Sequence, residues 1–470
     1  QQRIYMTAII ALSLFGISSL FLGFWFSRKV LQSLTLVFLL VGMALTAADW
    51  NQELLWFGHM FRTTNTSINF SLLIQLAAFL VVAFSRGFGN DDEHTHPAEY
   101  YALMLFSVVG AIMMVSFDHM IMLFVGLEIL SVAMYVLTGS DKRSLRANEA
   151  SLKYFLMGAF ATGILLFGIT LVYGATRSFY ISNIGTIIAS TAPESTPNFL
   201  YIGVLLMTVG LLFKVSAAPF HFWTADVYDG APSIFTMFMS TVVKTAGFAA
   251  LYHIVGDVFG GIYSTWVMTI YFVSMLTLIV GNVTAVYQQS VKRMLAYSSI
   301  SHAGYMLMTV SAHQTSSTST ILYYSLAYIL ATATAFAVFI LVSDYQTGRK
   351  EKPENFQSFE GLAKNNPGLA FCFTISLLSL AGIPLTGGFW GKFFVFSDTF
   401  NRNMTYPIIL AILMSAIGVY YYFKGIIAAY FRDGDIEKIE IPTLYKIALW
   451  ATTLGTLLLG IYPSLVKSIF

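Results

Sequence analysis

The chain has 470 residues, of which 57% are apolar and only 10% are charged. Soluble domains carry about 25% charged residues, so this composition indicates a polytopic all-α membrane protein. The formal net charge of +2 argues against nucleic acid as a partner, because phosphate binding needs clustered Lys and Arg on one face. The single cysteine, Cys372, excludes a disulfide framework and any cysteine-ligated iron–sulfur cluster or zinc site within this chain. We therefore expect no cofactor and no metal site here.

Apolar segments follow one another along nearly the whole chain, and each has the ~20 residues that a helix needs to cross a bilayer. We expect fourteen transmembrane helices, the first of them retained rather than removed as a signal peptide. They lie near 4–26, 30–48, 66–86, 98–115, 117–138, 149–174, 199–229, 232–256, 262–287, 291–311, 318–345, 367–400, 404–431 and 442–468. The polar stretches 87–97, 175–198 and 344–366 are expected to be loops, because they are rich in Gly, Pro and charge.

The distribution of basic residues predicts the orientation of these helices. The pairs Arg28-Lys29, Lys142-Arg143 and Lys292-Arg293 all fall in loops on the side away from the termini, where most of the other loop Lys and Arg also lie. Loops that are rich in Lys and Arg stay in the cytoplasm. We therefore expect both termini on the periplasmic side.

Once the basic residues of the loops and of the helix ends beside them are set aside, five remain inside the expected helices, and all five are lysines: Lys153, Lys214, Lys244, Lys392 and Lys424. Arginine stays protonated at any accessible pH, whereas a desolvated lysine can release its proton. A charge at a helix centre costs roughly 2.5–3.5 kcal/mol on insertion scales, so five such residues indicate a function. Lys153 and Lys424 lie near helix ends, where a lysine can also extend to the interface.

One carboxylate lies unambiguously in mid-membrane: Glu128, in MLFVGLEILSVAMY. Two interpretations are open. Glu128 either pairs permanently with a lysine to join two helices, or its charge controls the protonation of a neighbouring lysine.

His302 stands in the sequence KRMLAYSSISHAGYML, among hydroxyl residues that include Tyr297 and Ser298. A run of hydroxyls in an otherwise apolar helix can order water. His302 is therefore a candidate proton relay, with Tyr297 and Ser298 as further candidates, and the alternative is a hydrogen-bonded packing residue.

Two expected helices each combine a helix-breaking proline with a buried lysine. GLLFKVSAAPFHFW holds Lys214 and Pro219, and SLAGIPLTGGFWGKFFVF holds Lys392 and Pro384. Paired interruptions in corresponding positions indicate an internal repeat with a polar pathway at membrane depth. The two broken helices are the seventh and the twelfth, so the repeat is five helices long and must invert its topology.

The expected organisation follows from this repeat. We expect an N-terminal three-helix segment, a first repeat, a second and inverted repeat, and a C-terminal helix, with the boundaries 1–97, 98–258, 259–431 and 432–470.

The strings GLLFKVSAAPFHFWTADVYDGAP, VKRMLAYSSISHAGYML and SLAGIPLTGGFWGKF resemble the antiporter-like membrane subunits of respiratory complex I, and the ending DVYDGAP is most similar to the N-type. The resemblance covers the chain from about residue 30 to its end. It implies a non-redox subunit of a translocating NADH:quinone oxidoreductase in the bacterial inner membrane. It also implies proton-transfer roles for Glu128, Lys214, Lys244 and Lys392. Flavin, iron–sulfur clusters and quinone are then expected in partner subunits of the membrane and peripheral arms, with lipids around this chain.

The sequence departs from the family pattern at both breaks. The first usually reads Trp-Thr-Pro-Asp or Trp-Leu-Pro-Asp, and here Ala225 replaces the proline; the second often has two prolines, and here Leu385 follows Pro384. Both changes alter local geometry without removing a titrating group.

The sequence is also compatible with three other functions. A subunit of a multi-subunit sodium/proton antiporter would share the broken helices and lysines. A ferredoxin-driven or hydrogenase-linked relative would use another electron donor. A purely structural subunit would use its lysines only to join helices.

Overall fold

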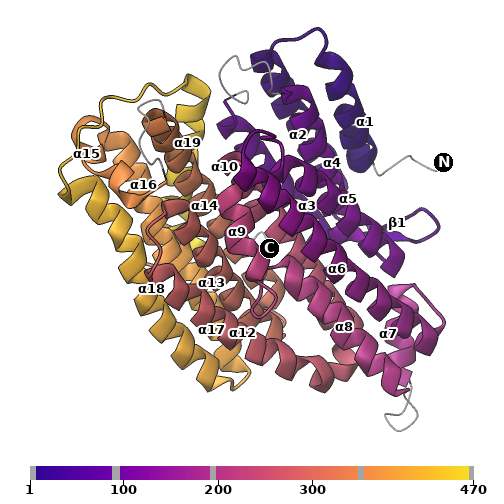
Figure 1. The fold of residues 1–470 in the computed structure, drawn as a ribbon. Coiled ribbons are helices and arrows are strands. Elements are labelled where there is room, and N and C mark those ends of the chain that lie inside the picture. The colour runs from indigo at the N-terminus through magenta and orange to yellow at the C-terminus, as the bar shows by residue number, and fades with distance from the viewer. Residues whose placement is uncertain (1–6, 87–95, 191–196, 348–353, 465–470) are drawn as a thin grey trace. The chain divides into compact units, whose positions relative to one another are not determined.

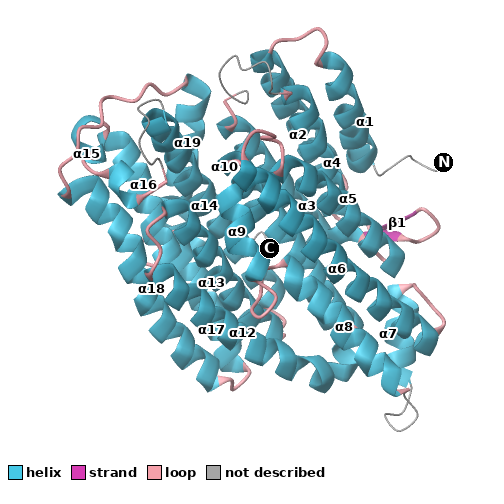
Figure 2. Cartoon of the chain, in the orientation of Figure 1, coloured by secondary structure: helices cyan, strands magenta, loops and turns pink. Residues whose placement is uncertain are grey.

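The computed structural model describes residues 7–86, 96–190, 197–347 and 354–464, which are almost entirely helical (Figure 1; Figure 2). The chain divides into two compact units, and each is built from two stretches of sequence. The first unit comprises Gln1–Ser216 and Val242–Ile270, and the second comprises Ala217–Thr241 and Tyr271–Phe470.

The first unit packs mostly neighbouring helices of the chain against one another. Its helices are α1 (Thr7–Leu22), α2 (Arg28–Ala48), α3 (Asn65–Phe84), α4 (Pro97–Ser116), α5 (Met120–Thr138), α6 (Leu145–Thr176), α7 (Ile181–Ser190), α8 (Asn198–Lys214), α11 (Lys244–Tyr252), η3 (His253–Val258) and η4 (Gly260–Ile262). The most extensive packing joins α6 to α8 and α4 to α5, and α11 lies against α3, α4 and α8. The two strands β1 (Leu54–Trp56) and β2 (Phe61–Thr63) form a short antiparallel hairpin.

The second unit brings a short segment of the first half of the chain together with the second half. Its helices are α9 (Phe222–Gly230), α10 (Ser233–Phe238), α13 (Val291–Ala312), α14 (Ser317–Thr347), η5 (Phe356–Phe359), α15 (Leu362–Asn365), α16 (Pro367–Ala381), α17 (Gly387–Asn401), α18 (Thr405–Phe431) and α19 (Thr443–Ile461). In it α14 packs against α16, α17 and α19, while α13 packs against α9 and α17. The π-helical segment η2 (Met239–Val243) and helix α12 (Tyr263–Val286) run from one unit into the other.

Three helices begin directly after a residue whose side chain caps the first turn. Thr64 and Ser67 form a reciprocal capping box at the start of α3. Ser144 and Ser290 accept hydrogen bonds from backbone N–H groups at the starts of α6 and α13. These contacts satisfy N–H groups that the first turn of any helix leaves without partners.

Most apolar segments expected from the sequence coincide with one helix or with a helix broken in two, and the segment 232–256 contains α10, η2, α11 and most of η3. The segment 66–86 is α3 and 291–311 is α13, while 199–229 is the pair α8 and α9 and 367–400 is the pair α16 and α17. Ten helices of the described chain are long and apolar enough to cross a membrane, and four shorter apolar helices accompany them. The last part of the expected segment 442–468 lies outside the described residues beyond 464.

Two predicted loops are wrong in part. The stretch 175–198 contains α7, whose buried Ile181, Ile184 and Ile188 share one face and pack toward η3 and η4. The stretch 344–366 contains the end of α14 as well as η5 and α15. Short helices with polar flanks do not stand out in a search for membrane-spanning length. Residues 87–95, 191–196 and 348–353 of the predicted loops lie outside the described residues.

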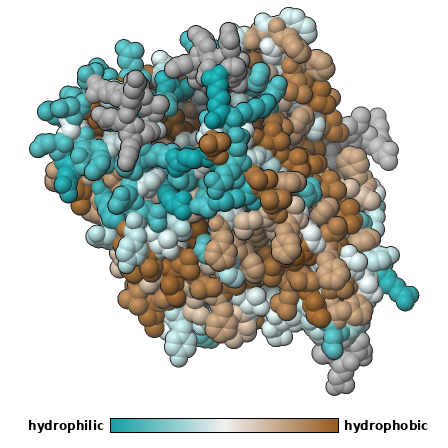
Figure 3. Space-filling model, in the orientation of Figure 1, coloured by the Kyte–Doolittle hydropathy of each residue, from teal (hydrophilic) through white to brown (hydrophobic). Residues whose placement is uncertain are grey.

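The surface polarity fits a membrane protein. In the second unit hydrophilic side chains gather around α15 and the loops beside it, whereas the surface of α18 is largely apolar (Figure 3). Apolar side chains such as Ile409, Ile412 and Leu413 are more than half exposed on this helix. Such an apolar outer surface is what lipid requires and what water disfavours.

Candidate functional site

Lys214 is the last residue of α8, directly before the first helix break. The chain leaves the helix there, Ser216 adopts a left-handed conformation with a φ of 64°, and α9 begins at Phe222. Pro219 lies inside this interruption. The Lys214 side chain is buried, and its Nζ donates a hydrogen bond to Ser131 Oγ at 2.7 Å. The same Nζ lies 5.8 Å from the ring centroid of Tyr154 on α6.

Glu128 lies one helical turn before Ser131 on α5, so both residues share a face of that helix. Its Oε1 is buried and has no hydrogen-bond partner in the described part of the chain. The structure therefore places Lys214 beside the face that carries Glu128, with the ammonium group bound to the hydroxyl. A buried carboxylate oxygen without a partner is costly, and such groups concentrate where charge changes during function.

Lys244 is the first residue of α11, immediately after the π-helical segment Met239–Val243. Its side chain is buried, and π-helical turns inside α-helices occur frequently at functional sites. Gly247 lies one turn further along α11. A Cβ built on Gly247 would lie 3.6 Å from Lys214 Cγ, so the aliphatic part of Lys214 packs against this helix. The first unit thus gathers Glu128, Lys214 and Lys244 on adjacent helices.

Lys392 lies in the helix that follows the second break. Helix α16 ends at Ala381, Pro384 lies in the interruption, and α17 begins at Gly387. Lys392 Nζ donates to the Ala381 carbonyl at 2.8 Å and to Ser415 Oγ at 3.0 Å. The lysine therefore satisfies a carbonyl that the broken helix has left without an intrahelical partner. This contact explains why a buried lysine and a helix-breaking sequence occur together.

The backbone of the second break has two left-handed residues, Gly382 and Leu385, and the second of these departs from the family pattern. Gly382 has a φ of 84°, and a Cβ there would lie 2.8 Å from Lys392 Cδ, so only glycine lets the lysine approach so closely. Leu385 has a φ of 70°, whereas proline is fixed near −65°. A second proline is therefore incompatible with this backbone.

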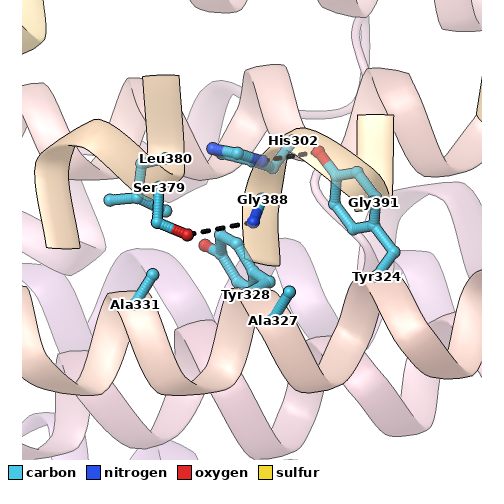
Figure 4. Close-up of a pocket in the computed structure, with 9 residues that line it drawn as sticks. All are labelled: His302, Tyr324, Ala327, Tyr328, Ala331, Ser379, Leu380, Gly388 and Gly391. Carbon is cyan, nitrogen blue, oxygen red and sulfur yellow. Dashed lines mark hydrogen bonds between the residues drawn. The ribbon is translucent and has the colours of Figure 1, made fainter. Parts of the chain in front are cut away.

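His302 on α13 is the centre of a buried hydrogen-bond network in the second unit. Its Nδ1 lies 2.6 Å from Tyr324 Oη on α14, and its Nε2 lies 3.2 Å from Tyr422 Oη on α18. Ser298 also hydrogen-bonds to Tyr422, which brings one of the predicted relay hydroxyls into contact with this network. In Figure 4 the imidazole and the Tyr324 hydroxyl point toward each other from different helices.

A small cavity adjoins this network. Its volume is about 10 Å³, which is close to the space that one ordered water requires. Its wall includes His302, Tyr324, Tyr328 and Ser379 (Figure 4). Tyr305 stands between the network and the terminal lysine, because its ring centroid is 6.2 Å from that of His302 and 4.8 Å from Lys392 Nζ.

The remaining candidate residues lie away from these centres. Lys153 forms an i,i+4 ion pair with Glu149 at 2.7 Å on a largely exposed face of α6. Lys424 donates a hydrogen bond to the Val286 carbonyl, and its Nζ lies 5.3 Å from the Tyr420 ring centroid. Tyr297 is half-buried and lies one turn from Arg293 on α13.

Lys292 stands at the start of the helix expected at 291–311, but the sequence did not predict its contacts: the residue is 3% exposed and belongs to α13. Lys292 Nζ donates to the carbonyls of Asp229 and Ala231, at 3.0 and 2.6 Å, and so caps the end of α9. The neighbouring Arg293 pairs with Asp226 at 3.0 Å.

The hydroxyl partners Ser131, Ser415, Tyr324 and Tyr422 were also missed. Ser and Tyr occur in many helices of this chain, so sequence alone does not distinguish those that meet a lysine or a histidine. In the parts of the chain that the structure describes, no group of three or more His, Cys, Asp or Glu side chains is placed to hold a metal ion.

Buried lysines at two helix breaks, a buried carboxylate and a buried histidine network define an ion-translocating membrane subunit of the antiporter type. In agreement with this, the family model of NADH:quinone oxidoreductase/Mrp antiporter membrane domains matches residues 118–418. NADH-quinone oxidoreductase subunit N of Cytophaga hutchinsonii is 40% identical over 469 residues, which cover 99% of each chain. The chain belongs to the NADH-quinone oxidoreductase subunit N family.

Two solved structures have the same fold. A chain of respiratory complex I from Thermus thermophilus matches with a TM-score of 0.82 and 31% identity, over 98% of both chains. A chain of the Mrp complex from Dietzia sp. matches with a TM-score of 0.85 over 98% of this chain and 96% of that one. Its identity is only 19%, so this second likeness concerns the fold alone.

Proposed function

We propose that this chain is a membrane-arm subunit of NADH-quinone oxidoreductase that translocates protons through Glu128, Lys214, Lys244, His302 and Lys392. One observation carries the proposal. Lys214 and Lys392 are buried in hydrogen bonds to neutral oxygens, the hydroxyls of Ser131 and Ser415 among them. Ser131 and Ser415 donate their own hydroxyl protons to the carbonyls of Leu127 and Ala381 and accept from the lysines, and an ammonium group and a neutral amine can each donate to them. Either protonation state of the lysine is therefore accommodated, which a permanent ion pair does not allow.

We also propose that the chain crosses the membrane fourteen times, with α8–α9 and α16–α17 each counted as one broken span. Two inverted five-helix repeats then contain one broken span each. Both termini lie on the periplasmic side of the bacterial inner membrane, and the loop before α13 lies on the cytoplasmic side.

Proton movement begins when quinone reduction elsewhere in the complex perturbs Glu128. Loss of the nearby negative charge disfavours the ammonium form of Lys214, which passes its proton through water to Lys244. The proton then moves through the His302 network to Lys392. Moving one charge across the membrane costs roughly 2.3 kcal/mol per 100 mV, so the carriers must never open to both sides at once.

The chain's own residues contribute proton transfer only. Electron transfer belongs to partner subunits, where flavin, iron–sulfur clusters and quinone act, and NADH is the donor that the family name implies. The chain's other partners are membrane-arm and peripheral-arm subunits and lipids.

The proposal is tested by reconstituting the whole complex in vesicles and measuring protons pumped per electron. Lys244→Ala should assemble and lower this ratio, whereas Lys142→Ala, which removes an exposed loop lysine, should leave it unchanged. An unchanged ratio for Lys244→Ala would contradict the proposal. Sodium-dependent proton exchange by the isolated membrane subunits, without any quinone reductase, would favour the antiporter alternative instead.

A further inference from the structure

A row of hydroxyl groups runs along one face of α14 from the His302 network toward the start of that helix. Tyr324, Thr320 and Ser316 are spaced four residues apart, so they lie on the same face with about 6 Å of rise between neighbours. Tyr324 contacts His302 at one end of the row. Ser316 lies at the other end, in the turn between α13 and α14.

The row ends at a buried carboxylate. Asp398 on α17 is 3% exposed, and its Oδ1 accepts a hydrogen bond from Ser316 Oγ at 2.6 Å. It lies six residues beyond Lys392, toward the end of the same helix. Burial of a carboxylate is costly, so a position of this kind indicates either an exchange of protons or a fixed structural contact.

Two hydroxyls in the middle of this route have unused hydrogen-bonding capacity. Thr320 and Thr309 are buried, and the Oγ1 of each has no hydrogen-bond partner among the residues described. Thr309 lies seven residues after His302, on the same face of α13, and its carbonyl accepts from Ser317 Oγ at 3.3 Å, which holds it beside the start of α14. Buried polar groups of this kind are normally satisfied by ordered water, which is also what proton transfer along a row of hydroxyls requires.

We propose that a proton held by Lys392 returns to the adjoining His302 network and leaves along this row to the surface at the α13–α14 turn, with Asp398 as the terminal carrier. Each step passes a proton from one oxygen or nitrogen to the next and involves no electron transfer. In the fourteen-span topology proposed above, the α13–α14 turn faces the periplasm, so the row is an outlet to that side. The inference rests on the proposed function, because it gives the relay its exit.

The alternative is that Asp398 only stabilises the start of α14 through Ser316 and the helix dipole. Asp398→Asn distinguishes the two, since an amide still accepts the Ser316 hydrogen bond but exchanges no proton. Thr320→Val removes a hydroxyl from the row at nearly constant volume. Thr334→Val is the matched control, because Thr334 is a buried threonine of α14 that bonds Leu330 and Thr452 away from the row.

The experiment measures assembly by native gel, quinone-reductase rate, and protons pumped per electron in vesicles that contain the whole complex. Asp398→Asn and Thr320→Val should assemble and pump no better than Lys392→Ala, while Thr334→Val pumps like wild type. Asp398→Glu and Thr320→Ser should recover most of the ratio.

The inference is overturned if Asp398→Asn and Thr320→Val pump at the wild-type ratio while Lys392→Ala does not, and the proposed function then stands. A normal ratio for Lys392→Ala would instead contradict the proposed function itself. If Asp398→Asn prevents assembly, the pumping ratios of Thr320→Val and Thr334→Val are compared instead. A lower ratio for Thr320→Val supports the inference, and equal ratios overturn it.

Discussion

Lys214 Nζ donates its hydrogen bond to Ser131, one helical turn beyond Glu128 on the same face of α5. The lysine is therefore held next to the carboxylate by a neutral group. A nearby negative charge favours the ammonium form of a buried lysine, so a change at Glu128 can alter the charge state that Lys214 prefers. This arrangement supports the interpretation of Glu128 as a switch over that of a permanent ion pair.

The first prediction concerns this carboxylate. Glu128→Gln is nearly isosteric, so the complex should assemble, but the charge that favours the ammonium form of Lys214 is lost and pumping should fall. Glu128→Asp shortens the side chain by one methylene and should give an intermediate loss. Native gels, quinone-reductase rates and pumping rates of both variants check this. Wild-type pumping by Glu128→Gln, or a defect that is explained by failed assembly, would favour the structural interpretation.

The second prediction concerns the hydroxyl that holds Lys214. Ser131→Ala removes its partner, and an unsatisfied buried donor costs about 1–3 kcal/mol, more when it is charged. We expect slower pumping that Ser131→Thr restores. The control is Thr208→Val on α8, since Thr208 bonds only a carbonyl of its own helix at 2.8 Å. Equal pumping by Ser131→Ala and the control would show that the hydroxyl has no part in proton transfer.

Much of the fold could be predicted from the sequence because hydrophobic length alone identifies a membrane helix. The segment expected at 30–48 is α2, Arg28–Ala48, and the prolines 219 and 384 lie in real interruptions. Helix α7 escaped detection because ten residues are too few to span a bilayer. The sequence also did not predict that Ala217–Thr241 belongs to the second unit, since this depends on packing between segments far apart in the chain.

The sequence identifies candidate site residues where a charged side chain lies in an apolar segment, but it does not identify their partners. A lysine or a glutamate in an apolar run is conspicuous. In the structure the Lys214 and Lys392 side chains are buried, and so is the Oε1 atom of Glu128. Their partners are hydroxyls and carbonyls, which are common in every helix. The contact of Lys292 with the end of α9 was not predicted, because it requires knowing that α13 lies beside that helix.

The third prediction tests the second helix break. Gly382→Ala places an L-residue at a φ of 84°, which costs roughly 1–2 kcal/mol, and its Cβ would lie 2.8 Å from Lys392 Cδ. We expect a less stable complex and reduced pumping. Gly163→Ala on α6 is the control, because a Cβ there meets no atom within 4 Å and alanine favours helix. Thermal unfolding of the purified complex checks both, and equal stability would contradict the close approach of Lys392.

The fourth prediction ranks substitutions of Lys392. A carboxylate can take up and release a proton, whereas a guanidinium stays charged. Lys392→Glu should therefore retain more pumping than Lys392→Arg, although arginine preserves the charge. Pumping by the two variants in vesicles, compared at equal quinone-reductase rate, gives the ranking. The opposite order would argue that the charge of Lys392 matters and its proton exchange does not.

The central claim is that a buried lysine changes its protonation state in every transport cycle, and Lys214→Arg tests it most directly. Arginine keeps the positive charge but cannot be deprotonated in this setting. The number of protons pumped per electron should be measured in vesicles that contain the assembled Lys214→Arg complex. The account predicts an assembled complex that still reduces quinone and pumps fewer protons per electron than wild type. A wild-type ratio in this variant would contradict it.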